Sequence, residues 1–455
     1  MLRWINPGAR TLTVVRASGW SLVARACGAL NMIVATPFVM KALSPAEFGV
    51  WATLVSVITL AGFLDFGIGN GAMNLVADAH GRDSPSDVRR VLREASAVLR
   101  HIGFAVAALA CAALWLPWWQ VLRLPVAAAF NATVAVAVVM GAVALAVPFS
   151  LGTRAMLGLG RGETVFRWQA AGQILSLGAI VVASVVRMTL PWMVAASLMA
   201  NVLPAAANWL TLHYDPQHGV ASEPSATRDP ALRRRILHDG AWFFALQLAG
   251  ALAFTIDLPL ITALRGPVEA GQYAVVQRLF STISIGLALI WTPLWPVYRH
   301  AIAAGDNRWV RRTVRMAIAA GAGAAAIGGC AFALGMPFIT RLWLGSVSAV
   351  PMTLLLGFAT WSVCEAAGQA LATFLNAAGI VRFQVATCVA LAIAAVCLKS
   401  AGLIEWGYAI VPWATVVAYV STTLLPTALQ FRRLSDKALE QHRPQPAADG
   451  QTIAS

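Results

Sequence analysis

The sequence predicts an all-α polytopic membrane protein with about twelve transmembrane helices in two parallel six-helix lobes. Three observations predict this fold class: an apolar composition, regularly spaced apolar stretches and an internal repeat. Of the 455 residues, 59% are hydrophobic and 11% are charged, whereas a soluble chain carries about 25% charged residues. This excess of apolar surface cannot all be buried in one water-soluble core, so the lipid bilayer is the expected solvent.

The internal repeat relates two segments that lie 222 residues apart. Residues 37–52 (PFVMKALSPAEFGVWA) align without a gap to residues 259–274 (PLITALRGPVEAGQYA). The same offset pairs Trp20 with Trp242, and residues 88–90 with residues 310–312. One register held over such a length indicates two copies of one structural unit, as in membrane transporters that are built from repeats.

About twelve apolar stretches are each long enough to cross a hydrocarbon core of ~30 Å. Turn residues and charges separate them. The predicted spans are residues 18–40, 47–72, 98–118, 130–155, 168–187, 191–212, 240–263, 269–296, 315–338, 349–377, 382–399 and 405–430.

The net charge of +14 arises mainly from loops on one side of the predicted spans. Cytoplasmic loops of membrane proteins are rich in Lys and Arg, so this side is predicted to be cytoplasmic, with both chain termini. The charges form no basic stripe with interleaved aromatic residues, and nucleic acid is not an expected partner. The opposite side is predicted to hold Lys41, Arg123, Arg187, Arg265, Arg341 and Lys399.

The even number of spans in each half places both halves in the same orientation. The predicted domains are an N-lobe (residues 1–212, spans 1–6), a cytoplasmic linker (213–238), a C-lobe (239–433, spans 7–12) and a disordered cytoplasmic tail (434–455). The linker is polar and rich in proline, and the tail is polar. The external loops are all short and leave no room for an outer catalytic domain.

Two arginines are predicted near the middle of the membrane, one in each lobe. Arg25 follows Arg16 by nine residues, which is ~13 Å along a helix. Arg278 follows Glu269 by the same number of residues in the eighth span. A charge near the bilayer centre costs ~2.5–3.5 kcal/mol on insertion scales, so each arginine needs water, an acidic partner or an anion. A structural ion pair or a snorkelling side chain is the alternative interpretation.

Three acidic residues also fall within predicted spans. Asp65 is placed near the cytoplasmic end of the second span, Asp257 towards the outer end of the seventh, and Glu365 in the inner half of the tenth. A buried carboxylate can take up a proton when its environment changes, which would couple transport to protons. Ion pairing with Arg25 or Arg278 is the alternative. The glycines beside Asp65 indicate close helix packing or a helix break and not a phosphate loop, because no strand precedes them.

Two matching arginine clusters precede the third and ninth spans. Their spacing places the side chains on one helical face at the cytoplasmic surface. They are either topology determinants that bind anionic lipid head groups or a basic rim that attracts an anionic substrate. The residues of this cytoplasmic basic rim are Arg89, Arg90, Arg93, Arg311, Arg312 and Arg315. No metal site and no cofactor is expected, since the cysteines and histidines lack ligand spacing.

Several of these segments resemble one known family. The opening pattern R-x(8)-R…P-x(7)-P-x-E-F-G-V-W, the segment DFGIGN (65–70), the segment LGLGR (157–161) and the segment GQYAVVQRL (271–279) are similar to polysaccharide transporters. These are the Wzx-like O-antigen and exopolysaccharide flippases of the MOP (multidrug/oligosaccharidyl-lipid/polysaccharide) superfamily. The resemblance covers nearly the whole chain through span count, parallel lobes and the position of the repeat.

The resemblance implies that the chain is not an enzyme. It implies a flippase that moves an undecaprenyl-diphosphate-linked oligosaccharide from the cytoplasmic to the periplasmic leaflet, by alternating access of two lobes in the MOP/MATE-like fold. The expected location is the bacterial inner membrane, and the expected partners are the lipid-linked substrate, membrane lipids and other polysaccharide assembly proteins. Related lipid II flippases carry cavity arginines in the first and eighth spans, which correspond to the spans of Arg25 and Arg278. Lipid II flippases usually have fourteen spans, so the peptidoglycan precursor is not the expected substrate.

Other functions make different predictions. A MATE-like, cation-coupled exporter of small molecules would need acidic residues as its essential cavity groups. A membrane polysaccharide polymerase, ligase or glycosyltransferase would need a large external loop or paired carboxylates at a loop face. Neither that loop nor such a carboxylate pair is visible in this sequence, and a purely structural scaffold is the remaining alternative.

Overall fold

The structure is a computed structural model that describes residues 7–61, 65–217, 229–303, 306–345, 350–378, 380–431 and 433. These residues form helices and short connections, and none of them is in a strand. The all-α fold class predicted from the sequence is therefore confirmed. The predicted tail and residues 218–228 of the predicted linker lie outside the described residues.

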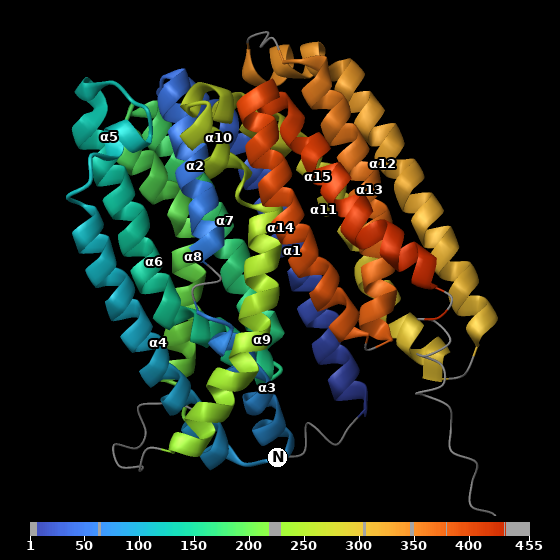
Figure 1. Cartoon of the computed structure of the whole chain (residues 1–455). Helices are drawn as coiled ribbons and strands as arrows, with labels where there is room; N and C mark the ends of the chain where they lie inside the picture. Colours follow the sequence, from blue (N-terminus) through green and yellow to red (C-terminus); the bar gives the residue numbers. More distant parts are fainter. Residues whose placement is uncertain are drawn as a thin grey trace, which may run out of the picture.

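The first half of the chain contains α1 (Pro7–Ala42), α2 (Pro45–Ala61), α3 (Ile68–Gly81), α4 (Pro85–Ala113), α5 (Trp118–Val121), η2 (Val126–Ala128), α6 (Ala129–Gly158), α7 (Gly162–Val185) and α8 (Leu190–His213). The second half contains α9 (Pro230–Phe254), α10 (Asp257–Leu264), α11 (Pro267–Ala303), α12 (Asn307–Leu344), α13 (Met352–Ala377), α14 (Val381–Trp406), η4 (Tyr408–Ile410), α15 (Val411–Tyr419) and η5 (Val420–Leu424). Helices of the two halves stand side by side as two bundles, with α9 between them (Figure 1). Helix α1 begins at the lower end of the molecule as drawn in Figure 1.

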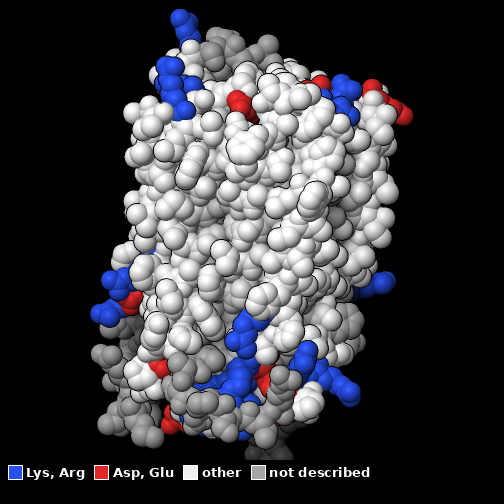
Figure 2. Space-filling model, turned by 90° about the vertical axis from the view of Figure 1, so that its left-hand side faces the viewer, with Lys and Arg blue, Asp and Glu red and all other residues white. Residues whose placement is uncertain are grey.

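Ten helices within the described residues are long and apolar enough to cross a membrane. They correspond to all of the predicted spans except the second and the eighth. The second predicted span is divided between α2 and α3, and the eighth is the long helix α11. On the face drawn in Figure 2, charged residues gather towards the two ends and leave an uncharged belt between them. This distribution is that of a protein whose middle is surrounded by lipid.

The repeated segments begin helices α2 and α11, and each helix has a proline in its first turn. Proline is favoured there because its missing N–H would be unsatisfied at any helix start. A capping box also begins α2, in which the Glu47 carboxylate accepts hydrogen bonds from the Ser44 N–H at 3.1 Å and the Ser44 hydroxyl at 2.8 Å. In α11 the equivalent Glu269 instead accepts from the Arg265 guanidinium at 3.2 Å.

The two repeat units meet through these equivalent helices. A Cβ placed on Gly49 of α2 would lie 1.7 Å from the carbonyl oxygen of Pro267 on α11. A Cβ on Gly271, the repeat partner of Gly49, would lie 3.3 Å from the Cα of Gly49. The Thr53 and Thr262 hydroxyls hydrogen-bond at 2.6 Å where α2 meets α10. The lobes are therefore closed against each other at this end of the molecule by backbone contact that only glycine permits.

We expect Gly49→Ala to force these helices apart and to destabilise the closed contact by about 1–3 kcal/mol, the usual cost of overpacking. Spin labels at the exposed positions 41 and 268, in a background without native cysteines, should report a longer and broader distance by pulsed EPR. Gly286→Ala on α11 is the matched control, because nothing lies within 4 Å of its Cβ position. An unchanged distance in Gly49→Ala would show that this contact does not hold the lobes closed.

At the opposite end, the break between α2 and α3 packs against α9. Gly67 has a φ of 71°, and a Cβ there would lie 2.1 Å from the Gly240 carbonyl oxygen of α9. The Phe66 and Phe244 rings pack beside this contact with centroids 4.8 Å apart. The predicted helix break and close packing around the glycines of residues 65–71 are thus present together.

The seventh predicted span is also broken, between α9 and α10 at Thr255 and Ile256. Helix α9 begins at Pro230, inside the segment predicted as a linker, and Asp229 caps it by accepting from the N–H groups of Ala231 and Leu232. The basic run at residues 233–235 therefore belongs to the first turns of a helix. The first part of α9 packs on α3, and its second part packs on α14.

Candidate functional site

Three adjoining cavities occupy the centre of the molecule. The N-lobe cavity, of about 640 Å³, is lined by α1, α6, α7, α8 and α11. A side cavity of about 160 Å³ shares Gly28, Gln173, Ala200 and Asn201 with it. The C-lobe cavity, of about 490 Å³, shares Ser284 and Ile285 with the N-lobe cavity. A large central space between packed helices is the usual position of a transporter's substrate site.

Arg25 lines the N-lobe cavity from α1, and its side chain is exposed. The neighbouring lining is polar and uncharged, and includes Gln169, Gln173 and Asn201. The Gln173 amide oxygen accepts a hydrogen bond from Asn31 at 2.8 Å, which holds that side chain in place. Within the described residues, no hydrogen bond or ion pair of Arg25 is found, so its guanidinium can bind a ligand in the cavity.

Arg278 lines the side cavity, although its helix α11 belongs to the second half of the chain. Its Nη1 donates to the Thr36 hydroxyl of α1 at 2.8 Å, and its Cζ lies 4.3 Å from the centroid of a Trp51 ring. Trp51 is in turn fixed by the hydrogen bond that its Nε1–H donates to Ser197 at 2.9 Å. A guanidinium stacked on an indole keeps its charge while most of its N–H groups can still donate to a ligand.

Arg25 and Arg278 are the only charged side chains among the described residues that line the N-lobe and side cavities. These cavities share four lining residues and are therefore neighbours, with one arginine in each. Two fixed positive charges without an acidic neighbour in the lining favour a ligand with negative charge.

The three acidic residues predicted within spans have different surroundings. In the described contacts, none of them pairs with Arg25 or Arg278. Asp65 is buried in the break before α3 and accepts from the Gly67 N–H at 2.9 Å. Its other oxygen and the Cγ of Arg154 lie 2.6 and 2.9 Å from the Cβ position of Gly69. Asp65 therefore helps to shape the helix break.

Asp257 belongs to a buried network at the break between α9 and α10. Its Oδ1 accepts from the Lys399 ammonium at 2.5 Å, and its Oδ2 accepts from the Tyr273 hydroxyl at 2.6 Å. Lys399 also donates to the Ala253 carbonyl oxygen at 2.6 Å. The ammonium thus satisfies a carbonyl at the end of α9 and a carboxylate at the start of α10.

The position of Lys399 corrects a prediction. The sequence predicts this lysine at the outer surface, because the predicted eleventh span ends at it. Helix α14 instead continues to Trp406, and the Lys399 side chain is 0% exposed. A buried Asp257 requires a cationic partner, and that requirement was the one available signal for this pair.

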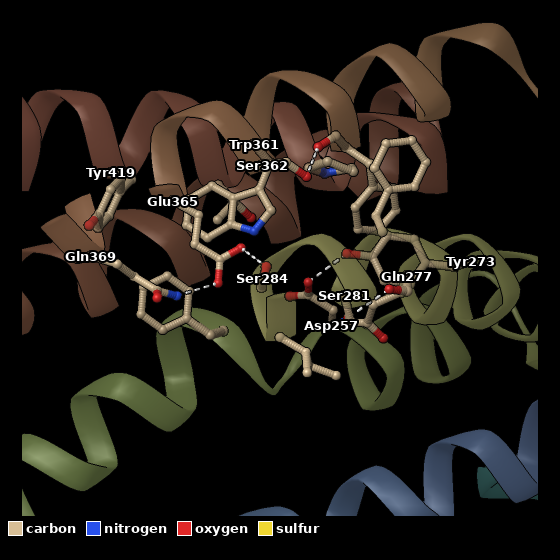
Figure 3. A pocket seen from close by; sticks show the side chains of 16 residues that line it. Asp257, Tyr273, Gln277, Ser281, Ser284, Trp361, Ser362, Glu365, Gln369 and Tyr419 are labelled. Carbon is tan, nitrogen blue, oxygen red and sulfur yellow. Dashed lines mark hydrogen bonds between the residues drawn. The ribbon is translucent and has the colours of Figure 1, made fainter. Parts of the chain in front are cut away.

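Glu365 lines the C-lobe cavity from α13. Its Oε2 accepts from the Ser284 hydroxyl at 2.7 Å, and its Oε1 accepts from the Gln369 amide at 3.1 Å. Figure 3 shows Glu365 directed towards Ser284 and Gln369 in this cavity. Of the three acidic residues, Glu365 is the one that both lines a described cavity and has only neutral hydrogen-bonding partners among the described contacts.

The two clusters of the predicted basic rim lie in the first turns of α4 and α12, at the end of the molecule where both helices begin (Figure 1). Arg89 donates to the Gln217 carbonyl oxygen at 2.9 Å, and Arg90 pairs with Asp87 at 3.1 Å. In the second cluster, Arg315 donates to the carbonyl oxygen of Arg311 at 3.2 Å. The clusters belong to different lobes and are separate from the central cavities.

Comparison with known proteins assigns the chain to a family. The family described as polysaccharide biosynthesis protein matches residues 14–299, which is more than half of the chain. The chain belongs to the polysaccharide biosynthesis protein family. No curated protein matches the chain.

Solved structures share the fold of this polysaccharide biosynthesis protein at low sequence identity. An inward-facing MATE multidrug resistance transporter of the MOP superfamily has a TM-score of 0.74 and 13% identity, covering 92% of this chain and 99% of its own. The lipid II flippase MurJ in an inward closed conformation has a TM-score of 0.68 and 10% identity, covering 94% and 91%. An outward-facing MATE transporter has a TM-score of 0.59 and 14% identity, covering 94% and 96%. The predicted MOP/MATE-like fold is thereby confirmed.

Proposed function

We propose that this chain is a flippase that moves an undecaprenyl-diphosphate-linked oligosaccharide across the bacterial inner membrane during surface polysaccharide synthesis. The observation that carries the proposal is the pair Arg25 and Arg278, which line adjoining central cavities that have no acidic residue in their described lining. The family membership supports a role in polysaccharide synthesis. The MurJ-like fold supports the movement of a lipid-linked substrate.

In this proposal the arginines bind the diphosphate while the lobes rock about it. A sugar diphosphate is too polar to cross hydrocarbon, and fixed guanidinium groups replace the water and counterions that it loses. The prenyl tail stays in lipid. Substrate enters from the cytoplasmic leaflet, and the lobes then part at the α2–α11 contact to release it to the periplasmic leaflet.

The proposed orientation places both termini and the basic rim in the cytoplasm. The rim arginines lie at the end of the molecule where α4 and α12 begin, and short cytoplasmic loops are usually rich in Lys and Arg. There they attract anionic lipid head groups and the anionic substrate. Other polysaccharide assembly proteins are proposed as partners at the two membrane surfaces.

The acidic residues have distinct proposed roles. Asp257 forms a structural ion pair with Lys399, and Asp65 stabilises the break before α3. Glu365 is the remaining candidate for coupling to protons, because its carboxylate lines a cavity beside neutral partners. A cation exporter would instead need acidic groups where Arg25 and Arg278 lie.

Complementation of a flippase deletion tests the proposal. A strain that lacks its O-antigen or exopolysaccharide flippase accumulates lipid-linked intermediates, and this chain is expected to restore surface polysaccharide. Because flippases differ in sugar specificity, several strains with different repeat units should be used. Failure in all of them, at normal membrane levels of the protein, would contradict the proposal. Export of ethidium in place of rescue would favour a small-molecule exporter.

A further inference from the structure

The C-lobe cavity is lined by neither arginine and adjoins the N-lobe cavity that Arg25 lines. It is formed by Phe254 at the end of α9 and by residues of α10, α11, α13 and α15. Ser284 and Ile285 line both this cavity and the N-lobe cavity. Its volume of about 490 Å³ lies within the ~300–1,000 Å³ of small-molecule sites. A cavity of this size beside the N-lobe cavity has room for the sugars attached to a diphosphate that the arginines hold.

The cavity presents amide and hydroxyl side chains beside the Glu365 carboxylate. Glu365 accepts from Ser284 and Gln369 (Figure 3), and further polar side chains line the same cavity. These additional polar residues are Gln277, Ser281, Ser362 and Thr415. The Ser281, Ser362 and Thr415 hydroxyls donate to carbonyl oxygens of their own helices, so their oxygens remain acceptors for the O–H groups of a sugar. The Gln277 amide can both donate to and accept from a sugar hydroxyl.

Aromatic rings form one wall of the same cavity. The Trp361 ring lies 5.6 Å from that of Phe254 and 5.3 Å from that of Tyr419, measured between centroids. The Phe254 and Tyr419 rings are 6.2 Å apart. A pyranose ring has an apolar face of C–H groups, and a flat aromatic surface removes that face from water. An aromatic wall beside clustered amides and hydroxyls is therefore suited to carbohydrate.

The charge of the cavity restricts which carbohydrate it accepts. Among the described residues that line it, none is a lysine or an arginine. Asp257 is compensated by Lys399, and Glu365 has only Ser284 and Gln369 as described partners. A second carboxylate brought next to an ionised Glu365 would be repelled, whereas a hydroxyl would be accepted.

We propose that the C-lobe cavity binds the first sugars of the glycan, and that Glu365 selects uncharged sugars over acidic sugars. The proposal rests on the proposed flippase function and adds the class of glycan that the protein carries. Trp361 supplies the stacking surface, and Gln369 orients the Glu365 carboxylate by donating to it. The arginines thus bind the diphosphate of the substrate, and the C-lobe cavity binds its first sugars.

Three probes test this division on the full-length protein in detergent at neutral pH. They are farnesyl diphosphate, farnesyl diphosphate linked to a neutral disaccharide, and the same molecule with one hexose replaced by a hexuronic acid. Wild type is expected to bind the neutral disaccharide probe about tenfold more tightly than either of the others. Trp361→Ala should lose the gain from the neutral disaccharide, and Glu365→Gln should bind the two disaccharide probes equally. Cys364→Ala, one residue before Glu365 and outside the cavity lining, is the control.

Equal binding of the two disaccharide probes by wild type would overturn the proposal. So would a Trp361→Ala protein that keeps the full gain from the neutral disaccharide. Failure of the proposed function looks different, because farnesyl diphosphate would then bind equally to wild type and to Arg278→Ala. In that case the sugar site is tested with the free neutral disaccharide. Binding to wild type that is lost in Trp361→Ala would still support the site. No binding to wild type would overturn the proposal.

Discussion

Arg25→Ala and Arg278→Ala are each expected to abolish the restoration of surface polysaccharide without lowering the amount of protein in the membrane. Each substitution removes a charged hydrogen-bond donor from the cavity, and such a bond contributes about 1.5–3 kcal/mol. Because the two guanidinium groups line neighbouring cavities, loss of either would leave a diphosphate bound there partly uncompensated. The loss of affinity is expected to be about 10–100-fold for each arginine.

Two further variants separate charge from geometry at this site. Arg278→Lys keeps the charge but loses the planar group that lies over Trp51 and binds Thr36, so only partial export is expected. Arg16→Ala is the control on α1, because Arg16 is exposed and outside the described cavity lining. Export is measured as surface polysaccharide per unit of membrane protein. Full rescue by both alanine variants would refute diphosphate binding, whereas loss of the protein itself would indicate a structural role for the arginines.

Lys399→Met is expected to destabilise the protein by about 3–5 kcal/mol, because it leaves the Asp257 carboxylate buried without its cation. Methionine has a similar length and fits an apolar site, so loss of the charge is the main change. Asp257→Asn in the same protein should recover most of the lost stability, since it removes the uncompensated charge. The free energy of unfolding is measured on detergent-purified protein for the single and double variants.

Lys41→Met provides the control, because Lys41 is an exposed lysine at the end of α1. Its expected effect is within about 0.5 kcal/mol, as for other surface substitutions. If Lys399→Met were as stable as wild type, the pair would not hold the α9–α10 break together. If the double variant were no more stable than Lys399→Met, the cost would come from packing and not from charge.

The repeat and the apolar spans could be predicted because they depend on composition and period, which the sequence states directly. The pairing of residues 37–52 with residues 259–274 anticipated equivalent helices, and in the structure Gly49 and Gly271 pack together. The helix break after Ile256 could not be predicted in the same way, because an apolar run reads alike whether its helix is continuous or broken. The end of the eleventh span was misplaced at Lys399, since a single buried charge and a helix end give the same local signal.

The placement of Arg25 and Arg278 in the first and eighth spans was accessible from spacing, but their surroundings were not. The contact of Arg278 with Trp51 and Thr36 joins residues from opposite halves of the chain. Such a contact depends on how two lobes pack, which no local pattern encodes. The aromatic wall around Trp361 was likewise hidden, because its residues are contributed by three separate helices.

The two attachments of α9 have a consequence for how the molecule divides when it moves. The first part of α9 is fitted against the Gly67 turn of α3, and its second part is tied to α14 through Lys399. A rocking motion that separates the lobes therefore cannot pivot at the chain connection alone. The seventh span is thus held by helices from both halves of the chain, on either side of its interruption at Thr255 and Ile256. A separation of the lobes that keeps both contacts would have to bend the seventh span at this interruption, so that part of the second repeat would travel with the first.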